Sequence, residues 1–134
     1  MIHLDTSFLV DLLRESARGK PGRATKFLGE IEEEQLAACV HVQCELHSGA
    51  EQSRRPEEER RRVDRLCQGF TIVYPDHRFP YAYARLLATL EGAGHRIGNM
   101  DLLIATSAVI SEAPLVTGNV GEFSRIADLE LLKY

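Results

Sequence analysis

The sequence predicts an α/β protein in which helices cover both faces of a parallel sheet. Short apolar runs recur at residues 2–4, 36–40, 71–74 and 115–117, and each is too short for a stable helix. Longer segments between them repeat their apolar residues at helical spacing, so strands and helices alternate along the chain. This alternation is typical of parallel strands joined by helical crossovers, which are buried on both faces.

In the first half of the chain, residues of known local preference mark where elements begin and end. Thr6 or Ser7 is expected to cap the first helix through its hydroxyl group. Residues 18–22 contain two glycines and a proline, which predicts a loop. Pro56 favours the start of a charged helix, and Gly69 its end. The expected elements are a strand at 2–4, a helix from residue 6 or 7 to about 15, a helix at 23–33, a strand at 36–40 and helices at 41–52 and 56–67.

The second half continues the alternation. Gly92 and Gly94 are expected to end a helix, and Asp76 is expected to cap that helix at its start. Asn99 can cap the helix that follows. The expected elements are a strand at 71–74, helices at 79–91 and 99–111, a strand at 115–117 and a candidate fifth strand at 130–132.

Composition limits the class of protein. The 134 residues, 44% of them apolar and 27% charged, suit one globular domain, so we expect a single domain over residues 1–134. No apolar run is long enough to cross a membrane, and acidic residues interrupt the apolar N-terminal segment, which argues against a signal peptide. Three cysteines without close pairing indicate reduced thiols and a cytoplasmic protein. The net charge of −4 predicts that any phosphate-binding surface is local.

The carboxylate of Asp5 directly follows the first predicted strand. In open parallel sheets, ligands bind outside the carboxyl ends of the strands, and Asp5 lies at such an end. An acid here can also serve as a helix cap, but the neighbouring Thr6 and Ser7 can do so without it. We therefore favour a functional role for Asp5.

Further acidic and polar residues lie beside apolar elements. Asp101 is in a helix that is apolar nearly all round, where a carboxylate is costly unless a cation or donor meets it. The first turn of a helix also favours an acid, so Asp101 alone does not decide between these interpretations. Glu45 alone is typical of a solvated helix residue, and Thr117, Asn119 and Glu122 alone indicate a polar turn after the fourth strand.

Asp5, Glu45 and Asp101 together favour a metal site. Carboxylates brought together repel one another and cannot all stay ionised without a cation. Mg²⁺ or Mn²⁺ takes oxygen ligands, can lower the pKa of a bound water and can stabilise charge on a phosphodiester. The pattern therefore points to metal-dependent phosphodiester hydrolysis.

Four segments occur in an order and spacing that resemble a known family. They are "LDTSFLVDLL", "CELHSGA", "NMDLLIATSA" and "LVTGNVGEF". Together they resemble a PIN domain, and more narrowly the VapC-type toxins of bacterial and archaeal toxin–antitoxin pairs. The resemblance extends over essentially the whole chain and is especially close in "YAYARLLATLEGAGHRIGNMDLLIA".

The resemblance implies a three-layer α/β/α sandwich and a Mg²⁺- or Mn²⁺-dependent endoribonuclease. It also implies a homodimer, an RNA substrate and a small antitoxin whose tail occupies the groove near the acidic site. In the implied mechanism, water activated with the help of a metal and a carboxylate attacks phosphorus in line. The expected products carry a 5′-phosphate and a 3′-hydroxyl.

The resemblance also assigns roles to individual residues. Asp5, Glu45 and Asp101 correspond to the central acids, which are expected to be catalytic and to bind the metal. Many relatives carry Asp where this chain has Asn119 and Glu122. Asn119 can offer only a neutral oxygen, and Glu122 is expected to reach the metal through water. This departure leaves the number of metal ions open. The residues expected to support the site or bind substrate are Thr6, Thr117 and Arg96.

Other features allow two interpretations. Arg96 is a candidate to steer phosphate, to neutralise the site or to be bound by an antitoxin. The arginines of residues 54–65 can contact RNA phosphates, but the pairs Glu57–Arg61 and Glu58–Arg62 at i,i+4 spacing favour a solvated helix.

The histidines lack a zinc-ligand pattern, and His3 is expected to pack in or beside the first strand. Apolar candidates for contacts with partners are Phe8, Leu12, Leu13 and Phe27.

Two alternative functions stay open at this point. One is a PIN-like nuclease that matures RNA or processes DNA without an antitoxin. The other is an α/β binding module without catalytic activity.

Overall fold

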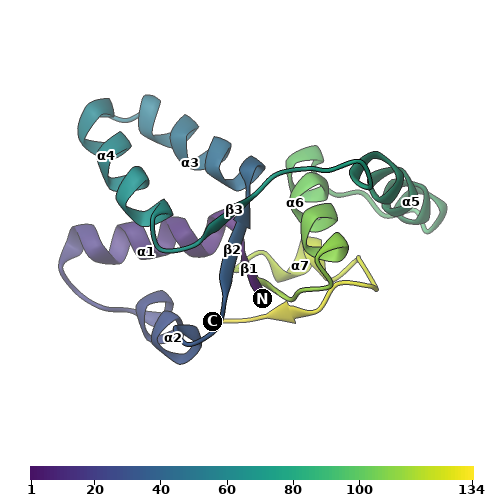
Figure 1. Ribbon diagram of the computed structural model, residues 1–134, viewed down its shortest axis with the longest axis horizontal. Helices are drawn as coiled ribbons and strands as arrows, with labels where there is room; N and C mark the ends of the chain where they lie inside the picture. The colour runs from purple at the N-terminus through teal and green to yellow at the C-terminus, as the bar shows by residue number, and fades with distance from the viewer.

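The computed structural model describes residues 1–134 and places five short strands in one parallel sheet (Figure 1). Every pair of neighbouring strands is parallel, which confirms the predicted sheet. The strands are β1 (Ile2–Leu4), β2 (Leu36–Cys39), β3 (Thr71–Val73), β4 (Leu115–Val116) and β5 (Leu131–Leu132), in the spatial order β3-β2-β1-β4-β5.

Helices lie on both sides of this sheet, as the alternation of elements predicts. In Figure 1 the sheet is seen edge-on, with α1 to α4 to its left and α5 and α6 to its right. This is the expected three-layer α/β/α sandwich. The helices are α1 (Thr6–Arg18), α2 (Arg23–Ile31), α3 (Val40–Glu51), α4 (Pro56–Cys67), α5 (Phe79–Gly92), α6 (Asn99–Ile110) and α7 (Val120–Phe123). None of them is both long enough and apolar enough to span a bilayer.

The central strand β1 is buried along its whole length because both faces of the sheet are covered. His3 lies in this strand with 1% of its surface exposed, and its Nε2 atom lies 3.1 Å from Ser111 Oγ. Burial lowers the pKa of His3 to about 4, so the ring is neutral at physiological pH. The prediction that His3 packs in the first strand is confirmed.

Two of the apolar candidates for partner contacts, Phe8 and Leu12, belong to the core. Phe8 is fully buried, and its ring packs edge-on against Phe27 and Tyr134 with centroid distances of 6.0 and 4.8 Å. Leu12 is also buried, whereas Leu13 and Phe27 stay partly exposed. The sequence alone does not separate these candidates from core residues, and the structure assigns Phe8 and Leu12 to the core.

The helix caps differ from the predictions. Asp5 occupies the cap position of α1, and neither Thr6 nor Ser7 bonds a free N–H of that helix, because both hydroxyls have partners elsewhere. Asn99 is the first residue of α6, and Gly98 occupies the cap position. The short helix α7 was not predicted.

Asp76 forms the turn before α5 by accepting the N–H of Arg78 at 2.8 Å, and Arg78 takes the cap position.

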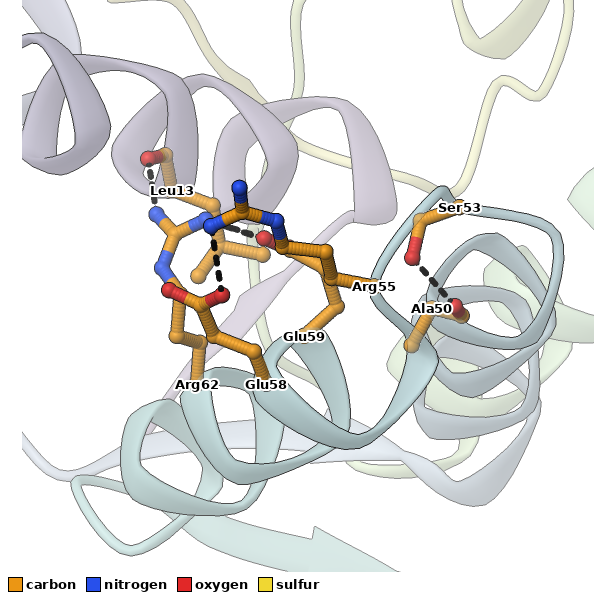
Figure 2. Close-up of polar contacts among 7 residues, drawn as sticks. All are labelled: Leu13, Ala50, Ser53, Arg55, Glu58, Glu59 and Arg62. Atoms are coloured by element: carbon orange, nitrogen blue, oxygen red, sulfur yellow. Dashed lines mark hydrogen bonds and ion pairs between the residues drawn. The ribbon is translucent and has the colours of Figure 1, made fainter.

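The ion pairs of α4 also differ from those that the spacing predicts. Arg55 pairs with Glu58 at 3.5 Å, and Arg62 pairs with Glu59 at 2.9 Å. Figure 2 shows the guanidinium of Arg62 reaching from α4 to α1, where it donates to the carbonyl oxygen of Leu13 at 2.6 Å. Arg62 therefore fastens α4 to α1 and is not free to bind phosphate.

Candidate active site

The predicted acidic residues come from four elements that meet at the carboxyl edge of the sheet. Asp5 directly follows β1, and Thr117 directly follows the neighbouring parallel strand β4. Glu45 lies in the second turn of α3, the helix that leaves β2 at this edge. Asp101 lies in the first turn of α6. The topology thus brings together positions that are up to 112 residues apart in sequence.

Asp5 is held by two hydroxyl groups. Its carboxylate is 3% exposed, and Oδ2 accepts hydrogen bonds from Ser7 Oγ at 2.9 Å and Thr117 Oγ1 at 2.6 Å. Each hydroxyl oxygen itself accepts a backbone N–H, from Gly118 and Asn119 respectively, both at 2.9 Å. With these N–H donors in place, both hydroxyl protons are directed to Oδ2. The other oxygen of Asp5, Oδ1, has no protein donor.

Glu45 is fixed in a similar way. Thr6 is the first residue of α1, and its Oγ1 donates to Glu45 Oε1 at 2.6 Å. This short bond ties α3 to the start of α1 at the point where the chain leaves Asp5. As at Asp5, one oxygen of the carboxylate is occupied, and Oε2 has no protein donor.

The raised pKa of Asp101 indicates that the acids lie close together. Its pKa is raised to about 6, first by burial and then by the negative charges of Asp5, Glu122 and Glu45. Asn119 Nδ2 donates to Asp101 Oδ2 at 3.3 Å, so the amide turns its nitrogen toward the carboxylate. The role of Asn119 as an oxygen donor to a metal stays a prediction, since the hydrogen bond shows only that its nitrogen faces Asp101.

The two remaining candidates lie at the rim of the cluster. Glu122, in α7, accepts the N–H of Gly98 at 3.4 Å and is close enough to Asp101 to raise its pKa. Arg96 is exposed and makes no ion pair, so it does not neutralise the acids in this arrangement. Its carbonyl oxygen accepts a hydrogen bond from the guanidinium of Arg125.

The donor set fits a hard divalent cation that retains water. No three Asp, Glu, His or Cys side chains are arranged closely enough to hold a metal ion by themselves. However, Asp5, Glu45 and Asp101 each bind a protein donor through one oxygen and leave the other free of protein donors. Mg²⁺ is usually bound through one or two carboxylates with water completing its shell. These free oxygens belong to carboxylates whose negative charges lie close together, and such a group of oxygens suits this kind of ion.

Sequence reasoning missed Ser7 as a site residue. Its position after Asp5 suggested only a helix cap, whereas its hydroxyl bonds Asp5 and the loop after β4. The available signal was that two hydroxyl residues, Thr6 and Ser7, follow Asp5. A helix cap needs only one hydroxyl, so the second was free for another role.

Neither of two cavities beside the helices encloses the acidic edge. A cavity of about 470 Å³ lies away from it, between α5 and the C-terminal end of α6. A smaller groove of about 220 Å³ runs between α1, α3 and α4 and includes Glu45 in its lining. A groove that one of the acids lines suits a chain-like ligand better than an enclosed small molecule.

The chain matches known proteins over most of its length. The model of the PIN domain family matches residues 2–129. Ribonuclease VapC1 of Haemophilus influenzae (strain R2866) is 32% identical over 127 residues, which cover 95% of this chain and 92% of that protein.

Two solved structures contain a similar chain. A chain of VapBC2 from Rickettsia felis, bound to a promoter DNA fragment, has a TM-score of 0.88 at 30% identity, with 100% of this chain and 99% of that chain covered. A chain of VapBC-1 from nontypeable Haemophilus influenzae has a TM-score of 0.85 at 31% identity, with 99% and 98% covered. The chain belongs to the PIN domain family and, within it, to the VapC group.

Proposed function

We propose that this chain is a Mg²⁺- or Mn²⁺-dependent endoribonuclease, the toxin of a type II toxin–antitoxin pair, folded as a single nuclease domain over residues 1–134. The observation that carries this proposal is the convergence of Asp5, Glu45 and Asp101 at one edge of the sheet, where burial and then the charges of Asp5, Glu122 and Glu45 raise the pKa of Asp101 to about 6. The name ribonuclease, printed for the similar VapC1 protein, supports the activity.

The acidic residues have different parts in binding the cation. Asp5 and Asp101 would hold it through their free oxygens, with Glu45 completing the cluster and Glu122 acting through water. The cation would supply positive charge that activates the attacking water and stabilises the phosphoryl and leaving oxygens. Asn119 would steady Asp101 through its amide N–H, as it does in the metal-free arrangement.

The side chains around the acids keep them in the form that the reaction needs. Ser7 and Thr117 donate to Asp5 Oδ2, which fixes the carboxylate and leaves Oδ1 free of protein donors. Thr6 holds Glu45 Oε1, which leaves Oε2 free to accept a proton from the attacking water. The water oxygen forms a bond to phosphorus as the bond to the 3′ oxygen breaks, which gives a 5′-phosphate and a 3′-hydroxyl.

The partners follow from the same proposal. The similar chains were crystallised in complexes called VapBC, which supports a small antitoxin as the partner of this chain. The groove between α1, α3 and α4 begins at Glu45, so a peptide tail lying in it would cover the acidic edge. A homodimer and a cytoplasmic location, where RNA is available, complete the proposal.

Cleavage of RNA by the purified protein tests this function. A mixed single-stranded RNA should be cut with Mg²⁺ or Mn²⁺, and a chelator should stop the reaction. Asp5→Asn and Asp101→Asn should abolish cutting, whereas Asp128→Asn, which changes an exposed acid away from the cluster, should not. Cleavage that survives both site variants, or that needs no divalent ion, would refute the proposal.

The antitoxin part has its own test. The product of a short reading frame next to the gene should co-purify with the protein and stop RNA cleavage. Active nuclease that no such product inhibits would favour a nuclease of RNA maturation instead. A protein inert with every divalent ion would favour a binding module without catalytic activity.

A further inference from the structure

We propose that Arg96 and Arg125 together form a phosphate-binding rim beside the acidic cluster, which holds the RNA backbone next to the bond that is cut. This inference rests on the proposed ribonuclease function and extends it to how the substrate is bound. It joins a residue of the loop before α6 to one of the turn after α7, and it gives Arg125 a role that its sequence context does not suggest.

The contacts place both arginines on segments that adjoin the acids. Arg125 donates from Nη1 to the carbonyl oxygen of Arg96, so its guanidinium lies against the backbone of that residue. Two residues further on, Gly98 donates its N–H to Glu122 Oε2 at 3.4 Å. A Cβ atom built on Gly98 would lie 4.0 Å from Asp101 Oδ2. Since two residues span at most about 7 Å, the Cα atom of Arg96 lies within roughly 13 Å of Asp101 Oδ2.

Both side chains are free to bind phosphate. Arg96 and Arg125 are exposed, and neither forms an ion pair, whereas Arg60, Arg62 and Arg78 are each paired with a carboxylate. The single bond from Arg125 to a carbonyl leaves most of its five N–H donors available. A planar guanidinium can bind a phosphate through two parallel hydrogen bonds.

The charge of the site explains why such a rim is needed. Four acids lie at or beside the catalytic edge in a chain of net charge −4, and the substrate is itself a polyanion. Without local positive charge, the acidic edge would repel the RNA backbone on either side of the cleaved bond. Two unpaired guanidinium groups on the segments that flank Asp101 and Glu122 would offset this repulsion where the strand enters or leaves the site.

RNA binding measured without cleavage tests the rim. In an Asp5→Asn background, the Kd of a fluorescein-labelled single-stranded RNA would be measured by anisotropy over a range of salt concentrations. Arg96→Ala and Arg125→Ala should each raise Kd about 5- to 20-fold and lower the salt dependence by about one phosphate contact. Arg23→Ala, which removes an exposed and unpaired arginine from α2, is the matched control and should change neither quantity.

A second variant separates charge from folding. Arg125→Gln keeps an N–H donor for the carbonyl of Arg96 and removes only the positive charge, so its Tm should match the wild type while its RNA affinity falls. In the otherwise wild-type enzyme, the same variant should raise KM and leave kcat nearly unchanged. Variants of both arginines that bind RNA as Arg23→Ala does, or that lower kcat at constant KM, would overturn the proposal.

The outcomes also distinguish the rim from the ribonuclease function. If the wild type cuts RNA in an Asp5-dependent way and the arginine variants behave as the control does, the rim is wrong and the function stands. If the arginine variants lose RNA affinity but the wild type never cuts, the rim stands and the catalytic proposal fails.

Discussion

Asp101→Asn should stabilise the metal-free protein, although it removes a residue of the proposed active site. Asp101 keeps its charge at neutral pH against burial and against three neighbouring acids, which together raise its pKa from 3.8 to about 6. A full shift of this size corresponds to roughly 3 kcal/mol of unfavourable free energy for the ionised form, and because Asp101 is only partly buried, screening by solvent reduces this to roughly 2 kcal/mol. Asn relieves that charge but weakens the bond from Asn119, so we expect a net gain of about 1–2 kcal/mol, or about 3–6 °C in Tm.

The sign of the pH dependence follows from the direction of this shift. The folded protein binds the Asp101 proton more tightly than the unfolded chain does, so stability falls as pH rises from 3.8 to about 6. The penalty is fully present above pH 6 and absent below pH 3.8. The advantage of Asp101→Asn over the wild type should therefore be largest above pH 6 and should disappear near pH 4.

Urea unfolding at pH 7.5 and pH 4, with and without Mg²⁺, measures these effects. Saturating Mg²⁺ should stabilise the wild type and have little effect on Asp101→Asn. The difference in free energy of unfolding between the two proteins at pH 7.5 should therefore become smaller or change sign. Equal destabilisation of the variant at both pH values would refute the reasoning, because Asp101 would then be an ordinary favourable helix residue.

Three further predictions concern single contacts. Thr117→Val removes a donor to Asp5 Oδ2 while keeping the side-chain shape, so kcat should fall about 10- to 100-fold in an RNA cleavage assay with circular dichroism unchanged; an unaltered kcat would contradict this. Arg62→Met removes the guanidinium that joins α4 to α1, which should cost about 1–2 kcal/mol in urea unfolding and leave kcat intact. The Thr25 hydroxyl, with neighbouring N–H groups, lowers the pKa of Glu15 to about 2, so its stabilising effect is present above pH 4.5 and lost toward pH 2. Glu15→Gln should abolish this part of the acid dependence, and an identical urea midpoint profile between pH 5 and 2 would contradict it.

The sequence was sufficient to predict the sheet because its strands are short apolar runs with clear ends. Residues 2–4 are followed at once by Asp5, and the same edge is marked by Thr117 after β4. Helix α7 could not be predicted in this way. Four residues do not form a stable helix alone, and α7 is held by the complete burial of Phe123, which is a tertiary effect.

The site was predictable in its acids but not in its hydrogen bonds. Acids beside apolar elements are unusual enough to be noticed, so Asp5 and Asp101 were found. A hydroxyl after a strand can cap a helix or bond a distant group equally well, and only the fold decides that Ser7 bonds Asp5. Likewise, helical spacing predicted Glu58 as the partner of Arg62, but Arg62 turns toward α1 and pairs with Glu59.

Anomalous diffraction from a crystal of the protein soaked in Mn²⁺ would examine the acidic cluster directly. We expect a manganese peak at the carboxyl edge of the sheet, in contact with Asp5 Oδ1 and with Asp101, and its loss in Asp5→Asn. Manganese bound only elsewhere, or a fully soaked active crystal with no peak between these two carboxylates, would contradict the metal-dependent mechanism.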